Sequence, residues 1–131
     1  MSAVEIFQIS VGQFESMIAG HPDAKICMVA AKLSAEIIVG MYDSEPGCYI
    51  GLAPPTLLSE KAYIWLIVTE VGAAHPRLLA RYSHGIIETA LLKYSTLTGH
   101  CFTESAAKWL LWLGAEFVGV HEFEIRRKTN G

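Results

Sequence analysis

The sequence predicts an α/β fold of the α+β type, in which helices pack on a mixed sheet of parallel and antiparallel strands. The predicted order of elements is β-α-α-β-β-β-α-β-α-β-β. Residues 62–70 (AYIWLIVTE) form a near-continuous apolar run, which is typical of a central strand covered on both faces. A long helical pattern follows at 76–94, and a further strand follows at 97–102. A strand, a helix and a second strand in this order imply a right-handed βαβ crossover. The length of 131 residues fits a single domain, residues 1–131.

The chain begins with a predicted strand and helix. Val4–Ile9 is predicted as a strand from the alternate positions of Val4, Ile6 and Gln8. Ser10 then offers an N-cap for a helix over 11–19, because a serine hydroxyl can accept a hydrogen bond from the first turn. Gly20 ends that helix, since glycine readily adopts the left-handed conformation found after helix C-termini.

A second helix is predicted over 23–33, with Pro22 near its first turn. Within it the segment 26–29 is also compatible with a strand. If the segment is helical, four apolar residues share one face and form the expected core stripe: Ile26, Val29, Ala30 and Leu33.

A hairpin is predicted next. Glu36–Tyr42 and residues 48–52 are rich in β-forming residues, and the separator 43–47 (DSEPG) carries strong turn chemistry. The second strand ends at 54–55, because two successive prolines cannot donate to a ladder.

The long helix follows a predicted loop at 72–75 and starts at Pro76. Its apolar positions recur at helical spacing. The predicted core stripe consists of Leu79, Tyr82, Ile86, Ala90 and Tyr94.

The segment 103–117 (TESAAKWLLWLGAEF) predicts a short amphipathic helix between two strands. Thr103 or Ser105 can cap its start, and Gly114 stands where a left-handed residue ends a helix. Its apolar face consists of Ala106, Trp109, Leu110 and Leu113. Two final strands are predicted at 116–120 and 123–127.

Composition excludes several classes of function. The net charge of −3 argues against general nucleic-acid binding, which requires a basic face. The three cysteines and the histidines show no metal-ligand spacing, so no metal site is expected. The longest apolar run, 62–69, is too short to span a bilayer. The first ten residues lack the pattern of a signal peptide, so a cytoplasmic location is expected.

The order of elements over 63–117 resembles the GNAT acyltransferase superfamily. The strand 64–69 (IWLIVT), the long helix, the strand 97–102 and the run KWLxxLGA at 108–115 carry this resemblance. They look like a phage branch that includes the internal virion protein A family of T7-like podoviruses. The resemblance implies a GNAT fold with an acetyl-CoA cleft between the central strand and 97–102.

The resemblance also implies where acetyl-CoA would bind. In relatives, the backbone of the central strand binds the pantetheine arm, which here points to Ile67, Val68 and Thr69. A glycine-rich loop and the following helix N-terminus bind the pyrophosphate, but the corresponding segment 70–77 (EVGAAHPR) holds one glycine and a proline. The side chains of Arg77 and Arg81 are the expected phosphate contacts instead.

The family's chemical positions are altered. The usual asparagine of the last helix aligns with Thr103, which keeps a hydroxyl and is taken as a cofactor-binding candidate. The usual proton-donating tyrosine aligns with Leu110, which cannot transfer a proton. Tyr94 is an alternative donor, although its place in the core stripe favours a packing role.

Two residues are candidates for the general base. Glu70 ends the central strand and His100 lies on the neighbouring strand. Either side chain can accept a proton from an amine. Glu70 can equally be a solvated strand-end carboxylate, and His100 can face a cleft or the surface.

Two functions from different classes remain. The altered residues favour a phage-type, virion-associated or morphogenesis protein with degenerate or absent acetyltransferase activity, located in the host cytoplasm or in a virion. Its partners would be virion proteins or a second copy, for which Trp109 and Trp112 on one short helix could provide a contact. The alternative is an active acetyl-CoA-dependent N-acetyltransferase that modifies a small-molecule or protein amine.

Overall fold

The computed structural model describes residues 4–21, 24–56, 58–100 and 104–127, and these contain seven strands and five helices. The elements are β1 (Val4–Ile9), α1 (Val11–Ile18), α2 (Ala24–Lys32), β2 (Glu36–Tyr42), β3 (Glu45–Ala53), β4 (Lys61–Val68), α3 (Glu70–Ala74), α4 (Pro76–Lys93), β5 (Thr96–His100), α5 (Glu104–Trp112), β6 (Glu116–Phe117) and β7 (Glu122–Arg126). The predicted mixed sheet with helices is confirmed, and its strand order is β1-β2-β3-β4-β5-β7-β6.

The chain divides into two compact units, and each is described by itself. Unit 1 comprises Met1–Ala53 and Trp65–Leu79, and unit 2 comprises Pro54–Ile64 and Ala80–Gly131. The expected single domain therefore stays a prediction. None of the helices in the described ranges is long and apolar enough to cross a membrane.

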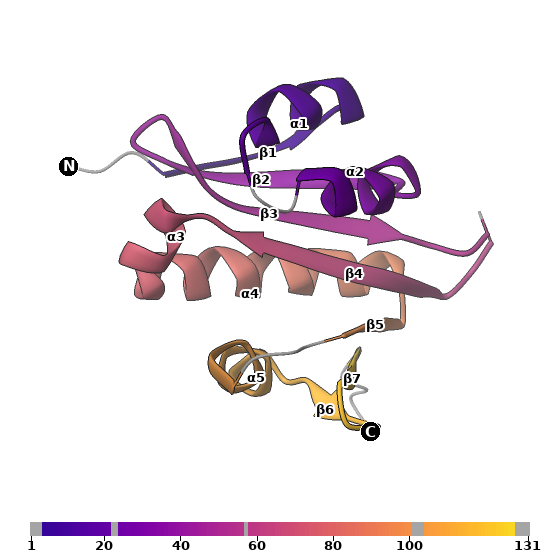
Figure 1. The fold of residues 1–131 in the computed structure, drawn as a ribbon. Helices are drawn as coiled ribbons and strands as arrows, with labels where there is room; N and C mark the ends of the chain where they lie inside the picture. Colours follow the sequence, from indigo (N-terminus) through magenta and orange to yellow (C-terminus); the bar gives the residue numbers. More distant parts are fainter. Residues whose placement is uncertain (1–3, 22–23, 57, 101–103, 128–131) are drawn as a thin grey trace. The chain divides into compact units, whose positions relative to one another are not determined.

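Unit 1 is built on the antiparallel strands β1, β2 and β3. Figure 1 shows α1 and α2, in indigo and violet, on one side of these strands. Phe14 of α1 is fully buried, and its ring centroid lies 5.1 Å from that of Tyr49 and 5.4 Å from that of Trp65. These aromatic contacts form the centre of the unit 1 core.

The predicted ends of α1 are confirmed. The Ser10 hydroxyl accepts a hydrogen bond from the Gln13 amide at 3.1 Å, and the Gln13 side chain accepts one from the Ser10 amide at 2.8 Å. This reciprocal pair satisfies two backbone groups that the helix itself cannot satisfy. Gly20 follows with a φ of 90°, the conformation that glycine adopts most easily.

Helix α2 confirms the helical alternative for 23–33, but the predicted core face is wrong. Three residues of the predicted stripe are exposed: Ile26 (75%), Val29 (64%) and Leu33 (70%). The residues that α2 buries are the smaller Cys27 and Ala31. Small side chains let a helix lie close to its neighbours. The face of α2 that carries Cys27 and Ala31 is therefore buried in preference to the face that carries the larger apolar side chains.

The hairpin between β2 and β3 is tighter than predicted. Asp43 and Ser44 alone form the turn, with φ values of 47° and 68°. Two successive residues with positive φ match the twist of a two-residue hairpin. β3 therefore starts at Glu45, and Pro46 is tolerated in the strand because the register shifts between Gly40 and Met41.

The predicted loop 72–75 is also wrong in part. Glu70–Ala74 form the short helix α3, whose N-cap is Thr69, and His75 alone separates α3 from α4. The Thr69 hydroxyl accepts a hydrogen bond from the Gly72 amide at 3.3 Å. A threonine followed by an acidic residue favours a helix start here, a signal that the sequence contained.

Unit 2 contains the first half of β4, with β5, β7 and β6. Lys61–Tyr63 pair in parallel with residues 96–98, and β5 and β6 both pair with β7 antiparallel. Most of the predicted stripe of α4 is buried, namely Tyr82, Ile86, Ala90 and Tyr94, whereas Leu79 belongs to unit 1 and is half-buried.

The last helix follows its prediction where the structure describes it. Leu110 and Leu113 of the predicted apolar face are buried, and Gly114 has a φ of 94°. The suggested caps are not tested, because Thr103 and the side chain of Ser105 lie outside the described residues. The predicted strand 116–120 is wrong in length, since only Glu116–Phe117 pair and the chain bends after them.

Candidate functional site

One face of the sheet in unit 2 is exposed and polar. Along the first half of β4, β5 and β7, buried residues alternate with polar ones that are half-buried or exposed. The register places Tyr63 beside Thr98, Thr98 beside Glu124, and His100 beside Glu122. Side chains at paired positions share a face, so residues distant in sequence meet on this surface.

His100 lies between a tyrosine and a glutamate on this face. Its Nδ1 atom is 3.4 Å from the Tyr63 hydroxyl, and its Nε2 atom is 3.9 Å from Oε1 of Glu122. The rings of Tyr63 and His100 have centroids 5.9 Å apart. The His100 side chain is 44% exposed, so a substrate from solution can reach it. An exposed imidazole is a candidate general base, because its neutral ring can accept a proton.

Carboxylates dominate the rest of this polar face. Glu124 forms an ion pair with Arg126. The Nη2 atom of Arg126 lies 2.8 Å from Oε2 of Glu124. The hydrogen bond with Glu124 raises the pKa of Arg126, and the nearby charge of Glu116 adds to the effect. Two cations, Lys61 and Arg126, share this face with three carboxylates, those of Glu116, Glu122 and Glu124, so carboxylates are in excess by one and the end of the face at Glu122 favours a cationic ligand.

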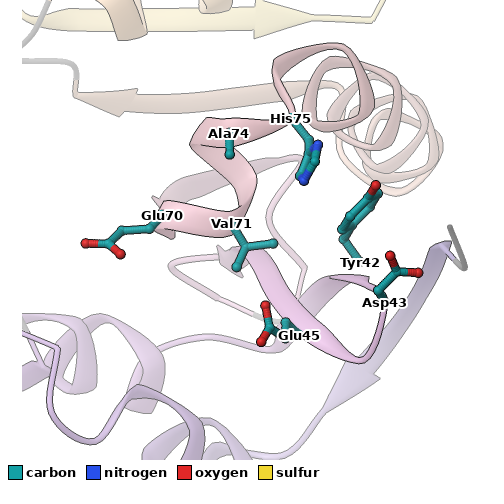
Figure 2. Close-up of a pocket in the computed structure, with 7 residues that line it drawn as sticks. All are labelled: Tyr42, Asp43, Glu45, Glu70, Val71, Ala74 and His75. Atoms are coloured by element: carbon teal, nitrogen blue, oxygen red, sulfur yellow. The ribbon is translucent and has the colours of Figure 1, made fainter.

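A separate pocket in unit 1 lies between the β2–β3 hairpin and α3. Its volume is about 510 Å³, and its lining residues are Tyr42, Asp43, Glu45, Glu70, Val71, Ala74 and His75. The rings of Tyr42 and His75 stack with centroids 4.0 Å apart. Figure 2 shows Glu70 directed away from this stack. Three carboxylates line the pocket, so it disfavours a phosphate group.

The predicted cofactor residues at the end of β4 have different roles in the structure. Thr69 donates its hydroxyl hydrogen toward the carbonyl oxygens of Pro46 and Gly47, at 2.6 and 3.1 Å, besides capping α3. Its side chain is therefore committed to the fold. Ile67 is half-buried and Val68 is 38% exposed, so the end of β4 presents apolar surface.

The first turn of α4 is the better match for an anionic group. Arg77 is exposed and forms no ion pair with any residue that the structure describes. The first helical hydrogen bond of α4 runs from Leu79 to the His75 carbonyl, which leaves the amides of Arg77 and Leu78 without helical partners. These amides and a guanidinium form a donor set that suits the pyrophosphate of acetyl-CoA.

The remaining predicted residues are spread over the molecule. Arg81 is exposed on α4, one turn after Arg77, and Tyr94 is 7% exposed in the core of unit 2. Thr103 lies outside the described residues. Leu110 is 2% exposed, in keeping with a packing role.

Sequence reasoning singled out His100 but missed its two neighbours. Tyr63 and Glu122 lie 37 residues before and 22 residues after His100, and only the strand register brings them together. The signal that could have identified them is the set of polar residues at alternate positions of the three predicted strands. Among the described residues no cluster of histidine, cysteine, aspartate or glutamate is arranged to hold a metal ion.

The fold is similar to those of solved acetyltransferases. A Desulfovibrio desulfuricans protein assigned to the GNAT acetyltransferase family superposes with a TM-score of 0.71 at 10% identity, covering 95% of this chain and 99% of that one. The Campylobacter jejuni N-acetyltransferase PseH, solved in complex with acetyl coenzyme A, has a TM-score of 0.65 at 10% identity, covering 96% and 100%. An N-acetyltransferase from Staphylococcus aureus Mu50 has a TM-score of 0.64 at 10% identity, covering 95% and 97%.

These structures show that the chain has the GNAT fold. No family model matches the chain, and no curated protein matches its sequence. At this level of identity the likeness concerns the fold alone, because one fold supports many functions. It carries no sign of the phage branch that the sequence suggested.

Proposed function

We propose that this chain is an acetyl-CoA-dependent N-acetyltransferase that acts on a cationic amine. The observation that carries the proposal is His100 beside Glu122 on an exposed, acidic sheet face of a GNAT fold. This is the alternative that the sequence left open, and it uses one of the two predicted bases.

The residues of the polar face match the needs of this reaction. An amine in water is protonated and must lose a proton before its nitrogen can attack an acyl carbon. The carboxylates of Glu116 and Glu122 attract the ammonium group, and His100 accepts its proton. Oε1 of Glu122 lies 3.9 Å from Nε2, within ion-pair distance of the ring when His100 carries the proton.

In the proposed complex the first turn of α4 holds the pyrophosphate of acetyl-CoA. Arg77, its own amide and the Leu78 amide supply the donors. Ile67 and Val68 provide apolar surface and backbone for the pantetheine arm. Bound acetyl-CoA supplies the thioester whose acyl group is transferred. Thr69 contributes indirectly, by fixing the corner where β4 leads into α3 and α4.

The other expected roles stay predictions. A place in a virion, virion partners and self-association rest on the sequence resemblance and on the tryptophans of α5. Trp112 is 59% exposed, which suits a contact surface.

Thermal unfolding with and without acetyl-CoA tests the cofactor. A ligand at about 100 times its Kd stabilises the folded state by about 2.7 kcal/mol, so a clear rise in Tm is expected. Arg77→Ala should reduce the rise, whereas Lys32→Ala, which removes an exposed charge on α2, should leave it unchanged. No rise at millimolar acetyl-CoA would rule out the proposed function.

Turnover with a panel of small primary amines and a lysine-containing peptide tests the base. His100→Gln should lower kcat about 100-fold, the scale of general base catalysis. His84→Gln is the matched control, because His84 also lies near a glutamate, with Nδ1 3.4 Å from Oε1 of Glu88, but on α4. Equal activity of the His100 variant and wild type would exclude His100 as the base.

A further inference from the structure

β1 has an open edge in the part of the chain that the structure describes. It stands at one end of the strand order, and within the described ranges its only neighbouring strand is β2. In an antiparallel pair, alternate residues direct both backbone groups at the partner strand, and the residues between them direct both groups away from it. β1 therefore presents a row of amides and carbonyls along its outer side. Another extended strand is the partner that satisfies such a row.

β1 lacks the features that usually protect the edge of a sheet. Its six residues (VEIFQI) include neither lysine nor proline, and they pair with residues 37–42 of β2 without a bulge. Ile6 is 45% exposed and Phe7 is 42% exposed. Successive residues point to opposite faces of a strand, so both faces of this edge carry uncovered apolar surface. Ile6 also stands opposite Gly40, which offers it no side chain.

We propose that β1 binds β1 of a second copy of this chain, antiparallel and centred on Ile6, so that the sheets of the two copies become continuous. The interface lies within unit 1 of each copy and does not depend on the proposed catalytic activity.

The sequence of β1 is complementary to itself in this arrangement. Two neighbouring copies are antiparallel when their two-fold axis is perpendicular to the sheet, so paired residues come from the same face and the pairing is centred on one residue. A centre at Ile6 sets Ile6 against Ile6 and Glu5 against Phe7. The two Glu5 carboxylates, the only charges of β1, then do not face each other.

The charge of Glu5 also argues against the neighbouring register. A centre at Phe7 would set Glu5 against Ile9, which is 6% exposed and belongs to the core of unit 1. The carboxylate would lose water there without gaining a partner. The pairing through Ile6 avoids this cost, and it joins residues 4–8 of each strand.

This contact closes at two copies, because the same surface is used on both. The paired segments are short, so we expect a dimer with a Kd in the micromolar range rather than a permanent assembly. Sedimentation velocity over a range of protein concentrations measures the Kd.

Ile6→Lys places two lysines opposite each other at the axis and should raise the Kd at least about tenfold, as should Ile6→Glu. An equimolar mixture of the two variants should dimerise with a Kd near that of wild type, because each lysine then faces a glutamate. Ile6 is exposed, so neither change should lower the Tm of the monomer, which circular dichroism checks.

Two matched variants serve as controls. Ile26→Lys and Trp112→Lys change other exposed apolar positions, on α2 and α5, and should leave the Kd unchanged. Dimers lost in either control but kept in Ile6→Lys would place the contact elsewhere and overturn the proposal. A mixture of the Ile6 variants that stays monomeric would also overturn it, as would a wild-type chain that is monomeric up to about 500 μM.

Amide hydrogen exchange locates the contact along the chain. Alternate amides of β1, those directed away from β2, should exchange more slowly at high protein concentration than at low concentration. Ile6→Lys should abolish this difference, while the amides bonded to β2 stay protected in both proteins. Slow exchange of the outer amides at every concentration would mean that the chain itself covers this edge, and it would overturn the proposal.

Discussion

Gly72 of α3 packs directly against the backbone of Gly47 in β3. A methyl group on Gly72 would overlap the Gly47 carbonyl oxygen and would lie 3.2 Å from the Val68 side chain. The same carbonyl accepts hydrogen bonds from the Thr69 amide and hydroxyl, at 3.0 and 3.1 Å. The corner that leads from β4 into α3 therefore depends on a contact that only glycine permits.

Replacing Gly72 should destabilise unit 1. We expect Gly72→Ala to lower the free energy of unfolding by about 1–3 kcal/mol, because the obstructing atoms belong to backbone and cannot rotate away. Urea denaturation followed by far-UV circular dichroism measures the change.

Gly85 provides the matched control, since a methyl group there meets no atom within 4 Å on α4. Gly85→Ala should raise stability by about 0.5–1 kcal/mol, the usual gain for alanine in a helix interior. Equal effects at the two positions would contradict the close packing of Gly72 on Gly47.

Ser34 should stabilise the fold through the indole of Trp65. Nε1 of Trp65 donates to the Ser34 hydroxyl at 2.7 Å, and Trp65 is 8% exposed. Ser34→Ala leaves this buried donor without its acceptor and should cost about 1–3 kcal/mol of stability. Ser16→Ala is the control, since Ser16 donates to the Gly12 carbonyl on an exposed helix face and should change stability by less than about 0.5 kcal/mol. A Ser34 variant as stable as its control would show that water replaces the hydroxyl.

Cys48 should make the protein sensitive to alkali. Burial raises the pKa of its thiol from 9.0 to about 11, although a hydrogen bond from the Gly40 backbone opposes the shift. Between these two values the unfolded chain loses the proton and the folded chain keeps it, so stability falls as pH rises. A difference of two units corresponds to about 2.7 kcal/mol in total. Burial also raises the pKa of Tyr49 above 10.0, which extends the loss to higher pH.

Unfolding free energies measured from pH 8 to 10 check this. Below pH 9 the Cys48 contribution is constant, and above it wild type should lose stability faster than Cys48→Ala. The variant's own packing loss appears at every pH and cancels in the slope. Parallel curves for the two proteins would mean that the thiol ionises equally easily in both states.

The order of elements was predictable because each carries a local signal. Ser10, Gly20 and Gly114 mark helix ends by their own conformational preferences, and the apolar run 62–70 marks a strand. The expectation that this strand is covered on both faces is wrong, because Tyr63 and Val68 are exposed. The start of β3 was missed because it depends on the pairing of β3 with β2. α3 was missed although Thr69 and Glu70 carry a local signal for a helix start. Pro46 argues against a strand locally, and only the shifted register at Gly40 and Met41 accommodates it.

The candidate site shows the same division between local and distant information. His100 is a candidate base from the chemistry of its side chain alone. Whether Tyr63 and Glu122 lie beside it depends on which strands pair and in which register. A shift by one residue would move either side chain to the buried face. Neither strand pairing nor register follows from the local pattern of β4, β5 or β7.

Most of the predicted apolar stripe of α2 is exposed, and substitutions can test this packing directly. Ile26 is 75% exposed and Ile18 of α1 is 3% exposed, so the same substitution at the two positions compares an exposed isoleucine with a buried one. Ile18→Ala should cost about 2–5 kcal/mol, because it removes buried methyl groups and leaves a cavity. Ile26→Ala should change stability by less than about 0.5 kcal/mol, since it removes no core contact and alanine favours helix. Urea denaturation at two protein concentrations measures both. A large loss at Ile26 in the monomer would mean that α2 turns its predicted stripe inward, whereas a loss confined to high concentration would mean that a second copy covers it.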